Sequence, residues 1–317
     1  MTSPETATDR VLDVLVVVPV FNGGSLWSEA AAALADARGA SRHHVRVKVV
    51  DSSSRDDSVA VARTHGFDVS VISGADFDHG GTRNTAVRGE PGDVYVFLTQ
   101  DAVLDDRSAL DHLVDVFKNP DVAVAYGRQL PHRNANPIAT HARLFNYGEQ
   151  SHVAGLEDRG RMGIKTVFTS NSFAAYRATV FNELGGFPER NILSEDMYFA
   201  ARAVLNGAKV AYVADARARH SHNYSPLEEF RRYFDIGVFQ ADHAWIGESF
   251  GGAEGEGMRF IKSELRRLSR IAPAWVPRAM LHNALKMLGY QLGRRYKRVP
   301  AALRPYLSMQ RKYWNRG

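Results

Sequence analysis

The segment FLTQDA (97–102) presents one carboxylate, Asp101, shortly after an apolar run. An acid in such a loop often caps the helix that follows, and Asp106 is well placed for that role. Capping does not account for Asp101. We therefore treat Asp101 as a candidate metal-binding or catalytic group and ask which other reactive residues could meet it.

Asp51 ends another apolar run, VRVKVVD (45–51), and begins the polar segment DSSSRDDS (51–58). Asp56 suits the cap of the next helix. Asp51 stands at the strand tip, where a carboxylate can accept a hydrogen bond from the imide N–H of a uracil or thymine ring. Asp51 is therefore a candidate for binding a nucleotide base.

Two glycines precede a predicted helix in DFDHGGTRNTA (76–86), and that helix is expected to begin with Thr82, Arg83 and Asn84. Glycine permits close backbone approach, a helix N-terminus favours anions, and Arg83 adds a permanent positive charge. These features suit a diphosphate clamp. Ordinary turn chemistry also uses Gly-Gly before a helix, so both explanations stay open.

In the segment SEDMYFAARAV (194–204), Ser194 is expected as the N-cap of a helix that carries Glu195 and Asp196 in its first turn. Acids at this position complement the helix dipole. Alternatively, Asp196 is a general base that removes a proton from an acceptor hydroxyl. The dipole is then expected to lower the pKa of Asp196, so the proton would move late in the reaction.

His220 and His222 follow a predicted strand in ARHSHNYS (218–225), and residues two apart share one face if the strand continues. Such histidines are often only surface residues. Imidazole and carboxylate ligands suit Mn²⁺, whereas Mg²⁺ prefers oxygen. Together with Asp101 and a nucleotide diphosphate, one of these histidines could complete the shell of a divalent ion.

The elements that must position these residues alternate between strand and helix. This alternation predicts an α/β protein with a mostly parallel sheet covered by helices, in which ligands bind at the carboxyl ends of the strands. The residues just after those ends, Phe21, Asn22, Asp51, Gln100 and Asp101, are then the functional candidates. Strands are expected at 11–20, 45–51, 68–72, 93–98, 122–128 and 209–215, and helices at 25–38, 56–65, 82–88, 107–118 and 195–206.

The bulk composition of the 317-residue chain is that of an ordinary globular protein, with 44% hydrophobic and 24% charged residues. The sequence has no cysteine, which excludes disulfides and thiolate metal sites. We expect no signal peptide, no membrane span and a cytoplasmic location, because the chain lacks a basic, apolar leader and any long uncharged apolar window.

Basic residues are concentrated at the C-terminal end. Residues 258–317 hold 15 Lys or Arg and a single acid, Glu264, whereas the net charge of the whole chain is +5. Apolar residues recur at helical spacing between these charges. Such helices predict contact with phosphates, and attachment to an anionic membrane surface is the interpretation we favour over nucleic acid. Packing of the tail on the main domain, or in a homo-oligomer, is the alternative.

Taken in order, these segments resemble the inverting family 2 glycosyltransferases of GT-A fold, which use nucleotide-sugar donors. VVVPVFN resembles the opening strand of the family, VVDSSSRDDS its base-binding strand and turn, GGTRN its glycine and Arg-Asn segment, FLTQDA its DxD position and SED its acidic pair. The resemblance covers residues 11–225. It implies a catalytic domain at 1–225 and a basic, helical region at 226–317.

The resemblance also implies a role for each matching residue. Asp196 would be the catalytic base, and Glu195 and Asn171 would bind substrate. Asp101, His220 and His222 would hold Mg²⁺ or Mn²⁺. The nucleotide-sugar donor would contact Pro19, Phe21, Asn22, Asp51, Ser53, Gly81, Arg83, Asn84, Thr99 and Gln100.

This sequence departs from the family pattern at Thr99, which replaces the first acid of DxD, so that only Asp101 remains as a carboxylate ligand. The segment TQDA, with FDHGGTRN before it and HSHNYS after it, resembles the corresponding segments of the bacterial rhamnosyltransferases that use dTDP-rhamnose. The resemblance implies transfer of rhamnose onto a cell-surface glycan or its polyprenyl-diphosphate-linked precursor, at the inner face of the membrane. UDP- and GDP-sugars remain alternative donors.

Two other classes fit less well. A sugar nucleotidyltransferase would carry a basic, glycine-rich loop after the first strand, which PVFNGGSLW lacks, and a dehydrogenase would carry GxGxxG there. A non-catalytic membrane or nucleic-acid binding protein would depend on the basic tail alone. In that class, Asp101 and Asp196 would have no catalytic role.

Overall fold

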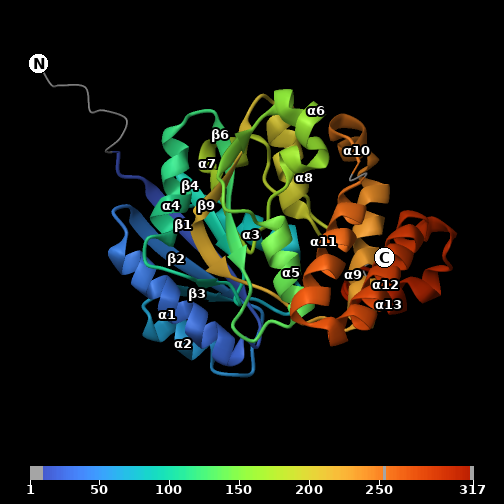
Figure 1. The fold of residues 1–317 in the computed structure, drawn as a ribbon. Helices are drawn as coiled ribbons and strands as arrows, with labels where there is room; N and C mark the ends of the chain where they lie inside the picture. Colours follow the sequence, from blue (N-terminus) through green and yellow to red (C-terminus); the bar gives the residue numbers. More distant parts are fainter. Residues whose placement is uncertain (1–9, 253–254, 315–317) are drawn as a thin grey trace, which may run out of the picture.

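The computed structural model describes residues 10–252 and 255–314, which fold into a central sheet flanked by helices (Figure 1). Its strands are β1 (Asp13–Val20), β2 (His44–Asp51), β3 (Asp68–Val71), β4 (Val94–Leu98), β5 (Val103–Leu104), β6 (Val122–Leu130), β7 (His152–Ala154), β8 (Phe173–Arg177) and β9 (Lys209–Arg219). The expected α/β class is confirmed.

Helices cover both faces of the sheet and then form a C-terminal group. They are α1 (Gly24–Ala40), α2 (Ser58–Thr64), α3 (His79–Val87), α4 (Ala109–Val114), α5 (Pro137–Asn146), α6 (Arg159–Met162), α7 (Ala178–Glu183), α8 (Glu195–Leu205), α9 (Pro226–Asp242), α10 (Ala244–Phe250), α11 (Glu256–Ile271), α12 (Val276–Arg294), α13 (Arg304–Leu307) and α14 (Arg311–Trp314). No helix within the described residues is long and apolar enough to cross a membrane.

The sheet has the strand order β3-β2-β1-β4-β8-β6-β9-β5, with β7 paired to β9. The first four strands of this order are parallel, as the βαβ pattern predicts. Strand β8, which the sequence analysis did not assign, pairs antiparallel with both β4 and β6. Strands β6 and β9 are parallel, and β5 and β7 pair antiparallel with β9. Most strands of the described sheet therefore run in one direction, as predicted, and β5, β7 and β8 oppose them.

Strand β1 is buried on both faces, which explains its continuous run of valines. Val14, Val16 and Val18 pack on one side with α1 and α4, whereas Leu15 and Val17 pack on the other side with the aromatic residues of α7 and α8. The register sets Val20 of β1 beside Asp51 of β2, so both strands end at the same level. This common level is what brings their following loops together.

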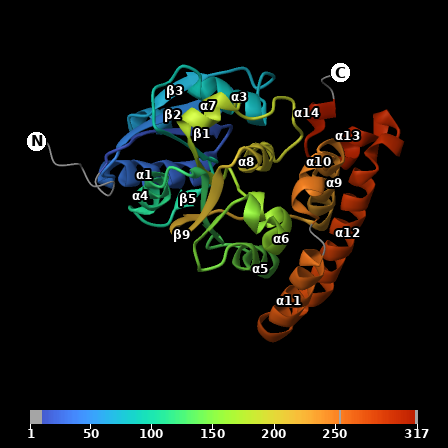
Figure 2. The same cartoon turned by 90° about the horizontal axis from the view of Figure 1, so that it is seen from above.

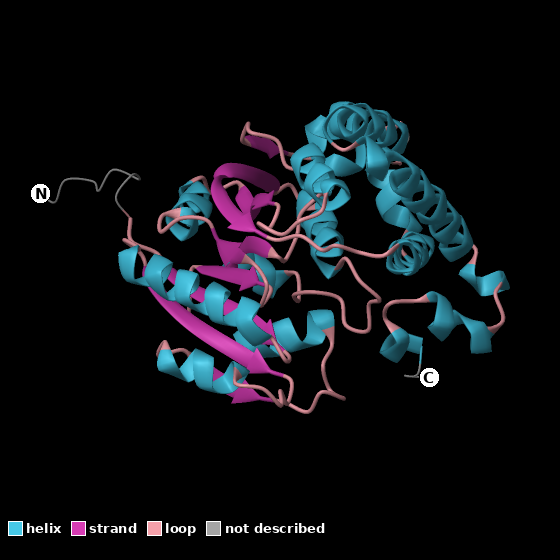
Figure 3. Ribbon diagram, turned by 60° about the horizontal axis from the view of Figure 1, so that its bottom comes forward, coloured by secondary structure: helices cyan, strands magenta, loops and turns pink. Residues whose placement is uncertain are grey.

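The C-terminal helices lie together on the side of the molecule away from α1 and α2 (Figures 1 and 2). Helix α9 begins after Ser225, whose hydroxyl accepts the N–H of Glu228 while the Glu228 carboxylate accepts the N–H of Ser225. Helix α12 packs closely on α9, and Gly293 permits this approach. A Cβ there would lie 2.1 Å from the carbonyl oxygen of Phe234. Figure 3 shows helices, in cyan, packed beside one another on the side of the molecule where the C-terminus lies.

Candidate active site

A cavity of about 790 Å³ lies at the carboxyl ends of β1 and β4 and extends to α5, α8 and α9. Residues from distant parts of the sequence meet there, as the position of the strand ends predicts. The predicted site residues that line it are Pro19, Phe21, Arg83, Thr99, Gln100, Asp101, Asn171, Glu195, Asp196, His220 and His222.

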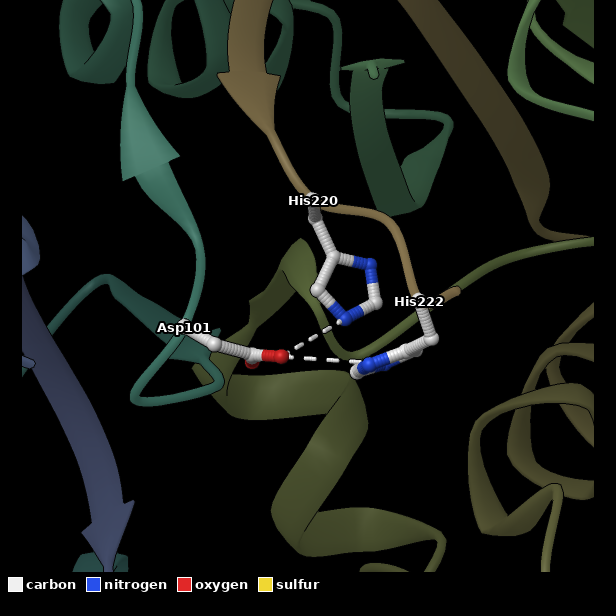
Figure 4. A group of neighbouring side chains, drawn as sticks. All are labelled: Asp101, His220 and His222. Atoms are coloured by element: carbon white, nitrogen blue, oxygen red, sulfur yellow. Dashed lines mark ion pairs between the residues drawn. The ribbon is translucent and has the colours of Figure 1, made fainter. Parts of the chain in front are cut away.

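Asp101, His220 and His222 form a compact group on one wall of the cavity (Figure 4). Asp101 Oδ2 lies 3.4 Å from His220 Nε2 and 3.6 Å from His222 Nε2. Candidate ligand atoms of the three residues all lie within 4.8 Å of one another. His220 directly follows β9, which extends four residues beyond the predicted end, and this extension carries His220 to the level of Asp101.

The protonation states suit a divalent cation. Burial opposes ionisation of Asp101, but His220 and His222 outweigh it and hold the pKa of the Asp101 carboxyl well below its usual range. Burial lowers the pKa of His222 to about 4, so this imidazole is neutral at pH 7. A carboxylate facing a neutral imidazole, as Asp101 faces His222, is the form in which these groups bind metal.

Gln129 fixes the orientation of His220 from behind. The side-chain oxygen of Gln129 lies 2.9 Å from His220 Nδ1 and also accepts a hydrogen bond from Arg143, while its amide nitrogen donates to Ser170. Arginine only donates, which identifies this atom of Gln129 as the oxygen and His220 Nδ1 as its donor. The lone pair of His220 Nε2 therefore points toward Asp101, and these residues fit a divalent ion.

The acidic pair lies on another part of the cavity wall, at the start of α8. Glu195 accepts hydrogen bonds from Arg83 Nη1 at 3.2 Å and from Asn171 Nδ2 at 3.0 Å. Asp196 Oδ2 accepts the backbone N–H of Asn171 at 2.9 Å, and Asp196 Oδ1 accepts that of Met197 at 2.8 Å. The two neighbouring acids therefore have different partners, and only Glu195 has a cation.

This difference separates their pKa values. Burial alone would raise the pKa of Glu195, but the Arg83 guanidinium, His79 and hydrogen bonds from Asn171 and the backbone together hold it below its usual range. Burial raises the pKa of Asp196 to about 7, and the negative charge of Glu195 adds to the rise. The prediction that the helix dipole lowers the pKa of Asp196 is wrong, because burial and the neighbouring carboxylate exceed the effect of the helix N-terminus. A carboxyl group poised near pH 7 suits a general base.

The N-terminus of α8 also differs in its cap. Ser194 occupies the predicted N-cap position, but its backbone is left-handed, with φ of 60°, and its side chain makes no capping hydrogen bond. The N–H of Met197 is bonded instead by the Asp196 carboxylate. The strained turn at Ser194 thus directs the first turn of α8, with both acids, at the cavity.

Gly81 and Asn84 do not line the cavity. Both polar atoms of the Asn84 side chain bond to the backbone of Phe187, at 2.9 Å each, and the N–H of Gly81 bonds to Asp78. The helix also begins at His79, three residues before the predicted start, so both glycines lie inside its first turn. Asn84 thus fastens α3 to the loop that precedes α8, whereas Gly81 belongs to the N-terminal cap of α3.

Three predicted donor-binding residues, Asn22, Asp51 and Ser53, lie at or just after the ends of β1 and β2 and do not line the cavity. The Asn22 side chain accepts the N–H of Arg55, and Ser53 Oγ donates to the carbonyl oxygen of Ile72 at 2.7 Å. Asp51 is buried, and one of its oxygens accepts the N–H of Ser54 while Asp51 Oδ2 has no hydrogen-bond partner within the described residues. Its neighbour Ser52 does line the cavity.

Gln100 lines the cavity, yet its side chain serves the fold. Its amide accepts the N–H of Phe21 at 2.6 Å and donates to the carbonyl oxygen of Phe21 at 3.2 Å. This pair of bonds ties the loop after β4 to the loop after β1. Phe21, whose side chain is 54% exposed, is thereby held at the cavity rim.

Several lining residues were not predicted, although His79 and Tyr224 lie within the quoted segments 76–86 and 218–225. Arg143 comes from α5, whose start at Asn136-Pro137 is a recognisable helix signal, and Arg232 and Tyr233 come from α9. The polar and aromatic members are His79, Gln129, Arg143, Tyr147, Ser170, Tyr224, Arg232 and Tyr233.

The C-terminal segment also reaches this cavity. Asp235 Oδ2 accepts the backbone N–H groups of Met309 and Gln310, at 2.9 and 3.3 Å, and Lys312 Nζ donates to the carbonyl oxygen of Gly74 at 3.0 Å. All three of these C-terminal residues line the cavity. Part of the basic C-terminal region therefore forms one wall of the cavity.

Comparison with known proteins agrees with this geometry. Residues 15–185 match the family model described as glycosyl transferase family 2. The chain is 48% identical to the O-antigen chain rhamnosyltransferase WbaN of Salmonella anatum, over 95% of each chain, and 49% identical to the O-antigen chain rhamnosyltransferase RfbN of Salmonella typhimurium, over 96% of each.

Two solved structures share the fold at low sequence identity. The mannosyltransferase PcManGT of Pyrobaculum calidifontis, in complex with GDP-Man and Mn²⁺, is 17% identical with a TM-score of 0.61 over 97% of this chain and 89% of that chain. The structure of S. aureus TarS 1-349 is 16% identical, with a TM-score of 0.52 over 90% of this chain and 91% of that chain. The acidic pair, the Asp-His-His group and the family match identify the chain as a member of glycosyl transferase family 2, a glycosyltransferase of GT-A fold.

Proposed function

We propose that this protein transfers rhamnose from dTDP-rhamnose to a hydroxyl of a lipid-linked O-antigen precursor. The observation that carries the proposal is the 48–49% identity to two O-antigen chain rhamnosyltransferases along nearly the whole chain. The acidic pair and the metal-binding group face one cavity, which supports the same reaction. UDP-sugars and GDP-sugars are the competing donors.

Asp196 is the proposed general base. Its carboxylate is oriented by two backbone N–H groups and has a pKa of about 7, so it can take the proton of the acceptor hydroxyl as that oxygen attacks the anomeric carbon. The C–O bond to the donor diphosphate breaks on the opposite side. A single in-line displacement with one base inverts the configuration at that carbon.

The proposed metal ligands are Asp101, His220 and His222, with Mg²⁺ or Mn²⁺ as the ion. A divalent ion held there would neutralise charge that grows on the departing diphosphate. Gln129 keeps the His220 ring in the ligating tautomer, and the low pKa of His222 keeps its ring neutral. These two features orient one imidazole and leave the other neutral, as a bound cation requires.

The proposed base-binding end of the cavity lies near the tips of β1 and β2. Pro19, Phe21 and Ser52 line this end, and Asp51 lies beside them with one buried, unpartnered carboxylate oxygen. An imide N–H of thymine would satisfy such an oxygen. Arg83 contributes positive charge, and its Nε has no hydrogen-bond partner within the described residues.

A thermal-shift and calorimetric panel of dTDP, UDP and GDP, each with and without Mn²⁺ or Mg²⁺, tests the proposal. We expect the largest stabilisation from dTDP with metal, and loss of the metal-dependent part in Asp101→Ala. Selective stabilisation by UDP or GDP would contradict the donor assignment. A metal-dependent shift that survives in Asp101→Ala would contradict the ligand assignment.

We also propose that the protein attaches to the inner face of the cell membrane through α12. Met280, Leu281, Met287 and Leu288 of this helix are each more than half exposed. The basic residues Arg278, Arg294, Arg295, Lys297 and Arg298 lie on or just after it. Exposed apolar side chains with nearby cations suit an anionic bilayer.

Binding to vesicles that contain phosphatidylglycerol tests this attachment. Met287→Glu with Leu288→Glu should reduce cosedimentation, whereas Val11→Glu, at another exposed apolar position, should not. Equal partitioning of all three proteins would contradict the proposal. Point variants are preferred to truncation because the C-terminal segment also lines the cavity.

A further inference from the structure

Two arginines outside the motifs quoted above, Arg143 and Arg232, line the cavity from α5 and α9. Arg143 of α5 donates to Gln129, and its Nε is buried without a hydrogen-bond partner. The Arg143 guanidinium lies 5.7 Å from the ring centroid of Tyr147, and that of Arg232 of α9 lies 5.8 Å from the ring centroid of Tyr224. Over residues 10–252 and 255–314, neither arginine has a carboxylate within 4 Å.

The nearby acids already have other partners. Glu229, one turn before Arg232 on α9, pairs with Lys286 Nζ at 3.3 Å. Asp235, one turn after Arg232, accepts backbone N–H groups of the C-terminal segment, and burial raises its pKa to about 7. Glu195 pairs with Arg83. The Glu229 charge still acts on both guanidinium groups, but no carboxylate of the described residues pairs with either of them directly.

The donor has separate groups for its own charge. In the proposed function, its diphosphate lies against the ion held by Asp101, His220 and His222. Its base lies toward the tips of β1 and β2. Arg143 of α5 and Arg232 of α9 border the metal group and are not among the proposed donor-binding residues. Arg143 donates to the same Gln129 oxygen as His220, and the Tyr224 ring beside Arg232 lies 4.9 Å from that of His222.

We propose that Arg143 and Arg232 bind a phosphate or diphosphate ester carried by the acceptor. This inference rests on the proposed function and assigns the acceptor side of the same cavity. Arginine donates paired hydrogen bonds that match phosphate oxygens, and a desolvated guanidinium is a strong partner for them. The ester anchors the acceptor while its hydroxyl approaches Asp196. Neutral glycans lack this anchor and bind more weakly.

Binding of geranyl diphosphate to the full-length protein saturated with dTDP and Mn²⁺ tests the inference by calorimetry. We expect one equivalent to bind to the loaded protein. Arg232→Gln should weaken this binding about 10-fold or more, since a hydrogen bond to a charged group contributes about 1.5–3 kcal/mol. Arg232→Lys keeps the charge but not the paired donors, so its affinity for geranyl diphosphate should lie between those of the unmodified protein and Arg232→Gln. This intermediate affinity would show that the loss in Arg232→Gln does not come from misfolding.

Arg231→Gln is the matched control. Arg231 is the neighbouring residue on α9, bonds to the carbonyl oxygen of Tyr306 and does not line the cavity. The Arg231→Gln variant should bind geranyl diphosphate with the affinity of the unmodified protein. If Arg231→Gln and Arg232→Gln weaken the binding of geranyl diphosphate equally, the effect comes from the net charge of the protein, and the inference is overturned.

The affinity for dTDP separates the two proposals. In Arg232→Gln it should change less than twofold. A loss of dTDP affinity equal to that of geranyl diphosphate would assign Arg232 to the donor and overturn the inference, as would failure of geranyl diphosphate to bind the loaded protein. If the unmodified protein does not bind dTDP, the donor assignment fails. Binding of geranyl diphosphate alone, lost in Arg232→Gln, would then still support the arginine pair.

Discussion

The backbone N–H of Asn171 lies 2.9 Å from Asp196 Oδ2, which ties the loop before β8 to the first turn of α8. The side chain of the same asparagine holds Glu195, so one residue orients both acids. The hydroxyl of Tyr176 in turn fixes the Asn171 amide at 2.8 Å. This buried network explains how two adjacent acids are kept in different chemical states.

Asp196→Asn should remove the general base while leaving the cavity intact. We expect kcat to fall by about 10²–10⁴, the usual contribution of a positioned acid or base. Affinity for the nucleotide should stay nearly unchanged, because Asp196 is not a proposed donor ligand. Steady-state kinetics and calorimetry measure the two quantities. Near-normal turnover in this variant would remove Asp196 from the mechanism.

The pH dependence should report the pKa of Asp196, which is about 7. The base works only when ionised, so kcat/KM should fall about tenfold per unit below pH 7 and level off above it. Glu195→Gln removes the neighbouring negative charge that raises this pKa. The acid limb of that variant should therefore move to lower pH. A limb that stays in place or moves to higher pH would contradict the assignment.

Gln129→Ala should weaken metal binding without touching a ligand. The variant leaves His220 Nδ1 without its acceptor, so the ring can rotate or change tautomer. Loss of such a supporting hydrogen bond costs about 10–100-fold in metal affinity. A Mn²⁺ titration followed by electron paramagnetic resonance measures it. Gln150→Ala, at an exposed position outside this cavity, serves as the control and should bind Mn²⁺ normally.

The sequence predicts which residues meet at the cavity where a short polar segment follows a buried strand. Asp101 and His220 follow β4 and β9, and they meet because these two strands run in the same direction and end at one edge of the sheet. The sequence does not reveal which polar side chains have backbone partners. Asn22, Ser53 and Asn84 satisfy nearby backbone groups, a use that only the folded chain shows.

Residues that depend on long-range packing were missed for the same reason. Arg143 and Arg232 become neighbours of one cavity only when α5 and α9 pack beside the sheet. Strand β8 is rich in alanine, and its segment continues directly into α7, so local pattern did not separate the two. The pKa of Asp196 likewise depends on burial, which outweighs the local effect of the helix dipole.

The two glycines at the start of α3 should differ sharply when replaced by alanine. A Cβ on Gly80 would lie 2.2 Å from the carbonyl oxygen of Pro188, so the backbone must move. Overpacking of this kind costs about 1–3 kcal/mol in the free energy of unfolding. A Cβ on Gly81 meets the Asp78 side chain at 3.3 Å, and the expected change is less than about 1 kcal/mol, as for a tolerated substitution.

Urea denaturation of Gly80→Ala and Gly81→Ala measures this contrast, and dTDP affinity decides what the glycines do. If they serve packing of α3 against the loop before α8, Gly81→Ala should keep both its stability and its affinity for dTDP. If close approach of a diphosphate requires Gly81, the same variant should lose affinity at unchanged stability. The hydrogen bond from the Gly81 N–H to Asp78, at 2.8 Å, favours the first result because that donor is already in use.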